Sequence, residues 1–559
     1  MNIRIQPVLV LLMCALLLSS CASIYAGPAT PAPANMAPVH LPKPGMTQPV
    51  LTSPTTPALP TATFLPNAET LQVSIWVPPY LSASMGEALE APLRGLFVSE
   101  EAQANIRLEV GTENTVSQWV YALVTPFPSF LQGMSGDELL SRWQGAASVP
   151  PLLMDPNTHA MLTAHWGPAG ADVQVVPREQ LMDTAWAQRP SLAIVPFEDL
   201  DPRGKVLPVD GLSPVHRDFN LASYRLTIPI SLISDPDRVA LIRGNFLIPS
   251  SNLDPQKMTV VAVTGVTALV RATASAMERR GLLYPAEDIR GWLLEADITH
   301  ISNEVPFAAD CPPPNPTQES MRFCSSDEYI QLLEDIGTDV VELTGDHFQD
   351  WGTGAMLHTL DLYRQRGWPY YGGGSDLSEA RKALLLEHNG NRIAFIGCNA
   401  KGRAFAQASD TTPGAAACDM DGMAGEIRRL AGEGVLVIAT FQHFEYYSYV
   451  PQGDQPQDFR QMAEAGAVVV SGSQAHQPQG MEFWNSAFIH YGLGNLFFDQ
   501  YGLCEACRQG LIDRHVFYDG RHISTELLPL QFIDYARSRP MTTVEADALF
   551  ETLFQASGW

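Results

Sequence analysis

The sequence predicts an α/β protein with two folded regions, and two observations support this class. Apolar strings of strand length alternate with helix-like segments over most of the chain. Hydrophobic residues make up 46% of the 559 residues and charged residues 17%, which is a globular composition with an ample core. We expect an α/β domain over residues 69–250, a second over residues 254–540, and a closing helix over residues 541–559.

The first residues are typical of an export signal. A basic residue precedes the apolar run 8–18, which is too short to span a bilayer. The run leads to Leu18-Ser19-Ser20-Cys21, a string that resembles the bacterial lipobox, in which the cysteine is acylated. We therefore expect a signal peptide over residues 1–20 and lipid attachment at Cys21, since more than one acyl chain gives stable anchoring. An ordinary signal peptide cut near Ala26 is the alternative.

The segment after the predicted anchor has the composition of a tether. Residues 21–68 are rich in Pro, Thr and Ala, and Lys43 is the only charge between residues 26 and 66. Such a segment cannot bury enough apolar surface to fold, and its prolines favour an extended spacer. The net charge of −26 makes nucleic acid and anionic lipid surfaces poor partners. We expect an extracytoplasmic protein held on the cell membrane by its lipid.

The cysteines suggest disulfides. Of the eight cysteines, Cys14 leaves with the signal and Cys21 carries the lipid, so six remain. An even number in an exported chain favours disulfide pairing, and a metal cluster is the alternative. Only Cys504 and Cys507 have the C-x-x-C spacing of a metal-binding motif, and the sequence has no second pair with this spacing. The sequence-local pairs are Cys311–Cys324, Cys398–Cys418 and Cys504–Cys507, and other pairings stay open.

The first predicted domain alternates strands and helices. Ser135 is followed three positions later by Glu138, which is the pattern of a helix capping box. The order of elements resembles a type 2 periplasmic substrate-binding protein, on the string 119–130 followed by 135–143, and an unrelated α/β domain is the alternative. The predicted strands are 71–77, 104–110, 119–124, 172–176 and 191–195, with a helix over Gly86–Leu96.

The second predicted domain has the same alternation. Asn389-Gly390, within the string 386–395, is a strong hairpin signal, and further hairpins are predicted around Asn485 and Asp519-Gly520. The predicted strands are 258–264, 297–302, 339–343, 435–441 and 467–471, and the predicted helices are 285–294, 326–336, 355–366, 423–431, 458–464 and 544–556.

Polar clusters follow four of these strands. Ligands in open α/β sheets bind beyond the carboxyl ends of the strands, so the clusters should converge on one site. A lone histidine is more often structural, but four clusters in equivalent places favour a shared functional site or the relic of one. The clusters are Asn303-Glu304, Gly345-Asp346-His347, Gln442-His443 and Gly472-Ser473-Gln474-Ala475-His476.

Strings around these clusters resemble successive motifs of the CapA family, which serves capsule and poly-γ-glutamate synthesis. They stand in the family's order and cover about half of the chain. The resemblance implies a metallophosphatase-like (calcineurin-like) α/β sandwich over residues 254–540. The strings are EADITHISNE (295–304), DVVELTGDHFQDWG (339–352), QHFEYY (442–447), GSQAHQPQ (472–479) and YGLGNLFFDQ (491–500).

Two departures from the family pattern bear on metal binding. The family's first strand ends in Gly-Asp, whereas this chain has Gly265-Val266, and a valine cannot bind a metal. Gln474 stands where the family has a histidine, and an amide is a poor ligand for zinc or manganese. A full two-metal cluster is therefore not expected. Two alternatives stay open: one divalent ion (Mn, Zn or Fe) held by Asp346, His443 and His476, or a metal-free polar pocket.

The resemblance also implies roles for individual residues. His347 is the best candidate for a general acid, with a structural hydrogen-bonding histidine as the alternative. The implied catalytic residues are His347, His443 and His476; the implied metal ligands are Glu304, Asp346, His443 and His476; and the implied substrate-binding residues are Asn303, Gln474, Glu445 and Tyr446.

Two functional hypotheses follow. In the first, the protein helps to synthesise, attach or process an anionic surface polymer of the poly-γ-glutamate type, in the manner of a metal-dependent hydrolase. In the second, it is a non-catalytic receptor for a solute or polymer on the same scaffold. The retained histidines and acids favour the first, and the two departures favour the second. The partners expected are the membrane, a polymer or small solute, and no nucleic acid.

Overall fold

The computed structural model describes residues 73–81, 96–146, 150–245, 248–402 and 404–559. The predicted signal peptide, tether and lipid attachment at Cys21 lie outside the described residues, as does nearly all of the predicted helix Gly86–Leu96. Within the described ranges, every helix is too short or too polar to cross a membrane.

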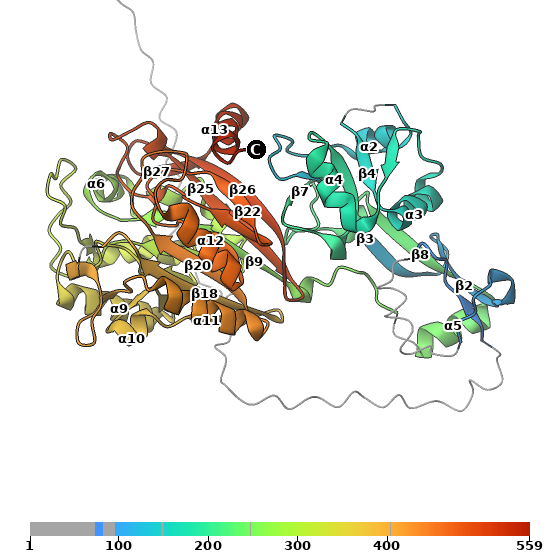
Figure 1. Cartoon of the computed structure of the whole chain (residues 1–559), viewed down its shortest axis with the longest axis horizontal. Helices are drawn as coiled ribbons and strands as arrows, with labels where there is room; N and C mark the ends of the chain where they lie inside the picture. Colours follow the sequence, from blue (N-terminus) through green and yellow to red (C-terminus); the bar gives the residue numbers. More distant parts are fainter. Residues whose placement is uncertain (1–72, 82–95, 147–149, 246–247, 403) are drawn as a thin grey trace, which may run out of the picture. The chain divides into compact units, whose positions relative to one another are not determined.

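The first part of the described chain forms an eight-stranded mixed sheet (Figure 1). Its long strand β3 (Thr115–Pro126) pairs antiparallel with β8 (Thr227–Ile233), β6 (Leu192–Pro196) and β7 (Gly204–Leu207). The remaining elements are β1 (Ile75–Trp76), β2 (Ile106–Val110), β4 (Leu152–Met154), β5 (Val173–Val175), α2 (Gly136–Trp143), α3 (Pro156–Trp166), α4 (Leu181–Ala187) and α5 (Pro236–Asn245).

Only one of the two hydrogen bonds of the capping box predicted at Ser135 forms. The Ser135 hydroxyl accepts a hydrogen bond from the Glu138 backbone N–H at 3.2 Å, which caps α2. The Glu138 carboxylate does not accept a hydrogen bond from the Ser135 backbone N–H. Instead it accepts one from Arg142 at 3.1 Å. The helix therefore has one of the two reciprocal bonds of the motif.

The second part of the described chain contains two main sheets. The nine-stranded sheet runs β15-β14-β11-β9-β25-β26-β27, with β10 paired to β11 and β24 paired to β10. Its strands are β9 (Met258–Thr264), β10 (Val266–Thr267), β11 (Ile298–Asn303), β14 (Val340–Glu342), β15 (Tyr370–Tyr371), β24 (Asn495–Phe497), β25 (Gln509–Tyr518), β26 (Arg521–Ile533) and β27 (Arg537–Pro540).

The six-stranded sheet runs β17-β18-β20-β21-β23-β22. Its strands β18, β20 and β21 pair in parallel, while the hairpins β17–β18 and β22–β23 are antiparallel. The strands are β17 (Leu384–His388), β18 (Asn391–Asn399), β20 (Leu436–Gln442), β21 (Ala467–Ser471), β22 (Met481–Trp484) and β23 (Ala487–His490).

The two sheets pack face to face with helices outside them. Val261 and Val263 of β9 share a buried apolar cluster with Phe395 of β18 and Ile438 of β20. Alternate residues of the same strands face outward and pack under helices, as the two-residue repeat of a strand requires. The outer helices are α6 (Arg271–Arg280), α7 (Arg290–Leu294), α8 (Ile330–Asp335) and α9 (Thr353–Arg366) on the nine-stranded sheet, and α11 (Met420–Gly432) and α12 (Gln455–Ala465) on the six-stranded sheet.

This arrangement confirms the predicted α/β class, with a sandwich of two sheets in the second part of the described chain. The helix α13 (Thr543–Ala556) packs Leu549 and Leu553 into the cluster between the sheets. The predicted helix over residues 285–294 is wrong in its first half. That stretch forms a 3-10 turn at Tyr284–Ala286 and reaches α-helix only at Arg290.

The structure brings the three predicted cysteine pairs within bonding distance. The Sγ atoms lie 2.04 Å apart in Cys311–Cys324, 2.00 Å apart in Cys398–Cys418 and 1.98 Å apart in Cys504–Cys507. The first pair closes a loop between the short strands β12 (Phe307–Ala308) and β13 (Ser325–Ser326). The second fastens the end of β18 to the segment before α11.

Replacing both Cys398 and Cys418 with serine is expected to lower the free energy of unfolding by about 3 kcal/mol. The pair is separated by 20 residues, and a cross-link that closes a longer loop removes more entropy from the unfolded chain. The matched control replaces Cys504 and Cys507, which are separated by 3 residues, and should lose about half as much. Denaturant unfolding of the oxidised proteins measures both; equal losses for the two pairs would contradict the loop-length argument.

Candidate functional site

Five strands deliver polar side chains to one edge of the sandwich. The strands β11 and β14 are parallel neighbours in one sheet, and β18, β20 and β21 are parallel neighbours in the other. Their carboxyl ends therefore lie on a common side of each sheet, where ligands of α/β folds bind. The residues that follow these strands and meet there are Glu304, Asp346, His347, Lys401, Glu445 and His476.

Glu304 is the central acid of this group. Its side chain is 1% exposed, and within the described part of the chain neither carboxylate oxygen has a hydrogen-bond partner. Its carboxylate has a charge contact with His476, whose Nε2 lies 3.9 Å from Oε1. Burial raises the pKa of Glu304 above its ordinary value, although the neighbouring histidines oppose this. A buried carboxylate without hydrogen bonds is costly unless a cation or proton compensates it.

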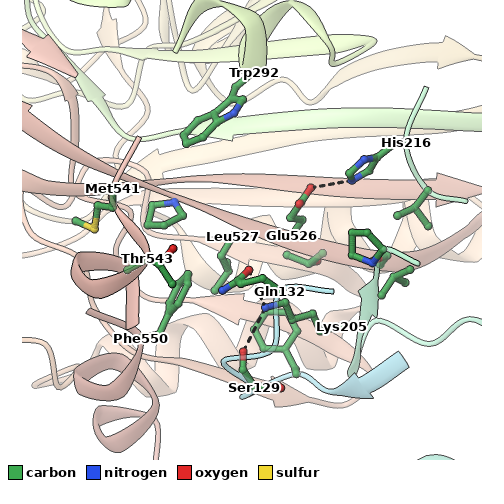
Figure 2. A pocket seen from close by; sticks show the side chains of 18 of the residues that line it. Ser129, Gln132, Lys205, His216, Trp292, Glu526, Leu527, Met541, Thr543 and Phe550 are labelled. Atoms are coloured by element: carbon green, nitrogen blue, oxygen red, sulfur yellow. Dashed lines mark hydrogen bonds and ion pairs between the residues drawn. The ribbon is translucent and has the colours of Figure 1, made fainter. Parts of the chain in front are cut away.

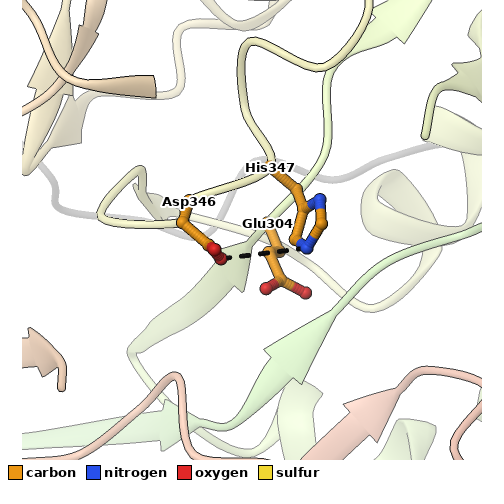
Figure 3. A group of neighbouring side chains, drawn as sticks. All are labelled: Glu304, Asp346 and His347. Atoms are coloured by element: carbon orange, nitrogen blue, oxygen red, sulfur yellow. Dashed lines mark ion pairs between the residues drawn. The ribbon is translucent and has the colours of Figure 1, made fainter. Parts of the chain in front are cut away.

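Asp346 and His347 face Glu304 from the turn after β14 (Figure 3). The turn can come close to the Glu304 backbone because residue 345 is glycine. A Cβ at residue 345 would lie 2.9 Å from the Cα of Glu304. His347 Nδ1 and Asp350 Oδ2 lie 2.6 Å apart, which orients the ring and leaves Nε2 toward Asp346 Oδ1 at 3.9 Å. Burial lowers the pKa of His347, but Asp350, Glu304 and Asp346 outweigh it and raise that pKa.

Lys401 reaches into the site from the end of β18. Its Nζ lies 3.1 Å from Asp346 Oδ2 and also pairs with Glu445 Oε1. Gln442 donates a hydrogen bond to the other oxygen of Asp346 at 2.8 Å. Burial alone raises the pKa of Asp346, but the charges of His347 and Lys401 and the Gln442 bond bring it below the ordinary value. Asp346 is thus an ionised carboxylate fixed on two sides.

His476 closes the site from the loop after β21. Its Nδ1 lies 2.9 Å from Asn495 Oδ1, and its Nε2 lies 3.4 Å from Glu445 Oε1. Burial lowers the pKa of His476, but Glu445, Glu304 and Asn495 together raise it to about 9. The same ion pair and Lys401 hold the pKa of Glu445 well below its ordinary value, against the effect of burial.

Four residues that the sequence predicted for the site do not join this group: Asn303, Gln474, His443 and Tyr446. Asn303 is fully buried and donates to Val305 O and the Tyr363 hydroxyl, both at 2.7 Å. Gln474 donates to Ser302 Oγ at 2.6 Å. These two amides bind the protein itself through their N–H groups.

His443 and Tyr446 lie beside the site rather than in it. His443 Nε2 lies 2.9 Å from Asp458 Oδ2, and the ring lines a separate hollow of about 290 Å³ with Asn399. Tyr446 is half-buried and stacks on the His443 ring, with centroids 6.4 Å apart. The structure therefore brings together Glu304, Asp346, His347, Glu445 and His476, and it does not add His443 to them.

The side chains present fit one cation better than two metals. Two sets of three ligand atoms lie within 4.8 Å of one another: one from Glu304, Asp346 and His347, and one from Glu304, Glu445 and His476. Both sets therefore depend on Glu304. Val266, at the position of the expected aspartate, sits in β10 and offers no ligand. The chain thus has a carboxylate and histidine group that could hold a metal ion, and at Val266 and Gln474 it lacks two donors of the family pattern.

Lys401 and Asp350 were not among the site residues predicted from the sequence. The hairpin string predicted around Asn389-Gly390 ends at residue 395, whereas β18 continues to Asn399. Extending the apolar string to its end would have placed Lys401 at the same edge as the four polar clusters. Asp350 lies in the string DVVELTGDHFQDWG, three residues after His347, but only the folded turn shows that its carboxylate meets the ring.

A second hollow of about 290 Å³ lies away from this site, and Figure 2 shows its lining. In it His216 Nε2 lies 3.5 Å from Glu526 Oε2, and Lys205 Nζ donates to Ser129 O at 3.3 Å. Burial lowers the pKa of Lys205 to about 8. Both potential metal-holding groups found among the described residues are at Glu304, and neither lines this hollow. The Glu304 group is therefore the better candidate site.

Comparisons with known proteins bear on the second half of the chain. Residues 260–500 match the family model described as bacterial capsule synthesis protein PGA_cap. A capsule biosynthesis protein CapA of Bacillus anthracis is 23% identical over 306 residues, which cover 54% of this chain and 74% of that protein. A PGA biosynthesis protein CapA of Bacillus subtilis is 29% identical over 195 residues, covering 34% of this chain; the match spans only 51% of that relative's length.

Solved structures give weaker matches. A putative 5'-nucleotidase from Staphylococcus aureus is 10% identical with a TM-score of 0.34, and the match covers 53% of this chain and 58% of that one. An ABC-type phosphate transport receptor from Vibrio cholerae is 9% identical with a TM-score of 0.27, and the match covers 31% of this chain and 92% of that one.

Proposed function

Because residues 260–500 of this chain belong to the bacterial capsule synthesis family, we propose that the protein acts in the synthesis, attachment or processing of an anionic cell-surface polymer of the poly-γ-glutamate type. The family supports a capsule-related function in general. The identity of the polymer, and the step at which the protein acts on it, are what we propose. It is supported by the polar group around Glu304, which lies within the matched residues at the ligand-binding edge of the sandwich.

We also propose that the protein lies outside the cytoplasm, anchored by a lipid at Cys21. The lipobox-like string, the tether composition and the three cysteine pairs support this location. A membrane-held position would keep the folded part near a growing or attached surface polymer.

At the site, we propose one divalent ion (Mn, Zn or Fe) held by Glu304 with either His476 and Glu445 or Asp346 and His347. A bound ion would supply Lewis-acid polarisation of a phosphoryl or carbonyl oxygen. The chain's own residues would orient the polymer and move a proton. His347 is suited to the proton step, because Asp350 fixes Nδ1 and leaves Nε2 facing the acids.

A second candidate function is a non-catalytic receptor for a polymer or solute on the same scaffold. The observation that favours it is the loss of donors: Val266 has no ligand atom, and Gln474 uses its amide N–H for Ser302. The receptor would bind the polymer without changing it. Incubating purified full-length protein and Mn²⁺ with poly-γ-glutamate separates the two: shorter or newly attached chains support catalysis, and unchanged but retained chains support the receptor.

Deleting the gene from the bacterium that encodes it is expected to lower cell-bound anionic polymer at least severalfold. The wild-type gene and a Cys14→Ser variant, which alters only the predicted signal, should restore it. Cys21→Ser should restore it poorly, because an unacylated chain leaves the membrane fraction. Polymer content after acid hydrolysis and membrane fractionation are the measurements. Unchanged polymer after deletion would overturn the proposed function, and membrane retention of Cys21→Ser would overturn the anchor.

A further inference from the structure

The two ligand sets at the site are joined by an ammonium group. Each set contains Glu304, and each has one further acid: Asp346 in the first and Glu445 in the second. Lys401 Nζ contacts both of these further acids, at 3.1 Å from Asp346 Oδ2 and in an ion pair with Glu445 Oε1. One positive charge therefore links the two sets at the place where they come together.

Lys401 is held in this position by burial and charge. Asp346 is fully buried and Glu445 is largely covered, so each needs a nearby cation. The lysine side chain is itself only 19% exposed. Withdrawing the ammonium would remove a close positive charge from a buried or largely covered acid of each set, which is unfavourable. The ammonium is thus a fixed part of the site.

Glu304 marks where a further cation would bind. Its carboxylate is 1% exposed, lies in both sets, and has no hydrogen bond from any described residue. Lys401 makes its contacts to Asp346 and Glu445, not to Glu304. Lys401 therefore meets Asp346 and Glu445 directly. The His476 ring stays 3.9 Å from Glu304 Oε1, beyond hydrogen-bond distance, so both Glu304 oxygens are left for a further cation.

We propose that Lys401 takes the place of one cation in a two-cation site, so that the protein binds one divalent ion fewer than its carboxylates could hold. The inference deepens the proposed function and rests on its assignment of the Glu304 group as the working site. Lys401 would be a specificity-determining residue: it sets the number of ions, and it supplies a permanent positive charge beside the bound one.

The test is a count of bound Mn²⁺ in full-length protein purified in detergent, by calorimetric titration and by elemental analysis after gel filtration. Lys401→Ala should bind one Mn²⁺ per chain more than wild type, because it frees Asp346 and Glu445 as ligands. Lys401→Arg, which keeps the charge, should match wild type. The surface variant Lys382→Ala is the control for loss of a lysine elsewhere.

Each outcome decides the proposal. An unchanged count in Lys401→Ala, or an added ion in Lys401→Arg, would overturn it. If Lys401→Ala does not fold, Lys401→Met keeps the length of the stem and is measured instead, with the rise in Tm on adding Mn²⁺ as a second readout. A further outcome is that wild type binds no ion while Lys401→Ala binds one. That result would support Lys401 as the stand-in cation, and it would refute the single ion of the proposed function.

Discussion

Replacing Glu304 with glutamine is expected to lower the affinity for a divalent cation by about 100-fold or more. Glu304 belongs to both sets of three potential ligand atoms found among the described residues, so its loss affects both. Glutamine keeps the size and removes the charge, and a neutral amide oxygen binds a divalent ion more weakly than a carboxylate does. Mn²⁺ titration of the full-length protein measures the loss. In the bacterium, the same variant should fail to restore surface polymer.

The same substitution should raise stability when no divalent ion is present, by about 1 kcal/mol, because a buried carboxylate costs more than a buried amide. Unfolding in EDTA measures this gain. The exposed Glu387 on β17 provides the matched control: Glu387→Gln should change neither the ion affinity nor the stability appreciably. Unchanged affinity in Glu304→Gln would place the ion elsewhere, and lower stability in EDTA would mean that Glu304 is chiefly a structural partner of the histidines.

Replacing Gly265 with alanine is expected to destabilise the protein by about 3 kcal/mol or more, or to prevent folding. Gly265 joins β9 to β10, where the backbone of Gly494 crosses closely. A Cβ at residue 265 would lie 1.9 Å from the Gly494 carbonyl oxygen, which belongs to the backbone and cannot turn away. Relief would require moving β10, which pairs with both β11 and β24 beside the site.

Gly291→Ala is the control for this prediction. Gly291 lies in the exposed part of α7, and a Cβ there would meet no heavy atom within 4 Å. Alanine should be neutral or stabilising by up to about 1 kcal/mol, because it has the higher helix propensity. Urea unfolding of both variants is the measurement. Similar stabilities for the two would show that the crossing at Gly265 can relax.

Elements with local signals were predictable from the sequence. Asn389-Gly390 forms the turn between β17 and β18 with φ values of 49° and 76°, as the dipeptide predicts. The helix α13 follows its apolar periodicity, and Thr542 with Glu545 forms a complete capping box. In these places the residues that fix the conformation are neighbours in the chain, so the pattern contains the information.

Elements stabilised from a distance were not predictable. The helix α6 consists mainly of small and charged residues without a wide apolar stripe, and no strong signal marks its start. Its first turn is capped by Asp499, whose Oδ2 accepts a hydrogen bond from the Ala272 N–H at 3.0 Å. The two residues are 227 positions apart in the chain. Only the assembled sandwich brings the cap to the helix.

By itself the sequence determined the α/β class, the hairpins, and the fact that several polar clusters follow strands whose ends meet. These depend on local propensity and on a general property of parallel strands. The tertiary structure decided which of those side chains face Glu304. It turns His443 toward Asp458, engages Gln474 with Ser302, and inserts Lys401 between Asp346 and Glu445. Such contacts depend on how the two sheets pack and on which buried charges are paired with each other. Neighbouring residues in the sequence do not contain this information.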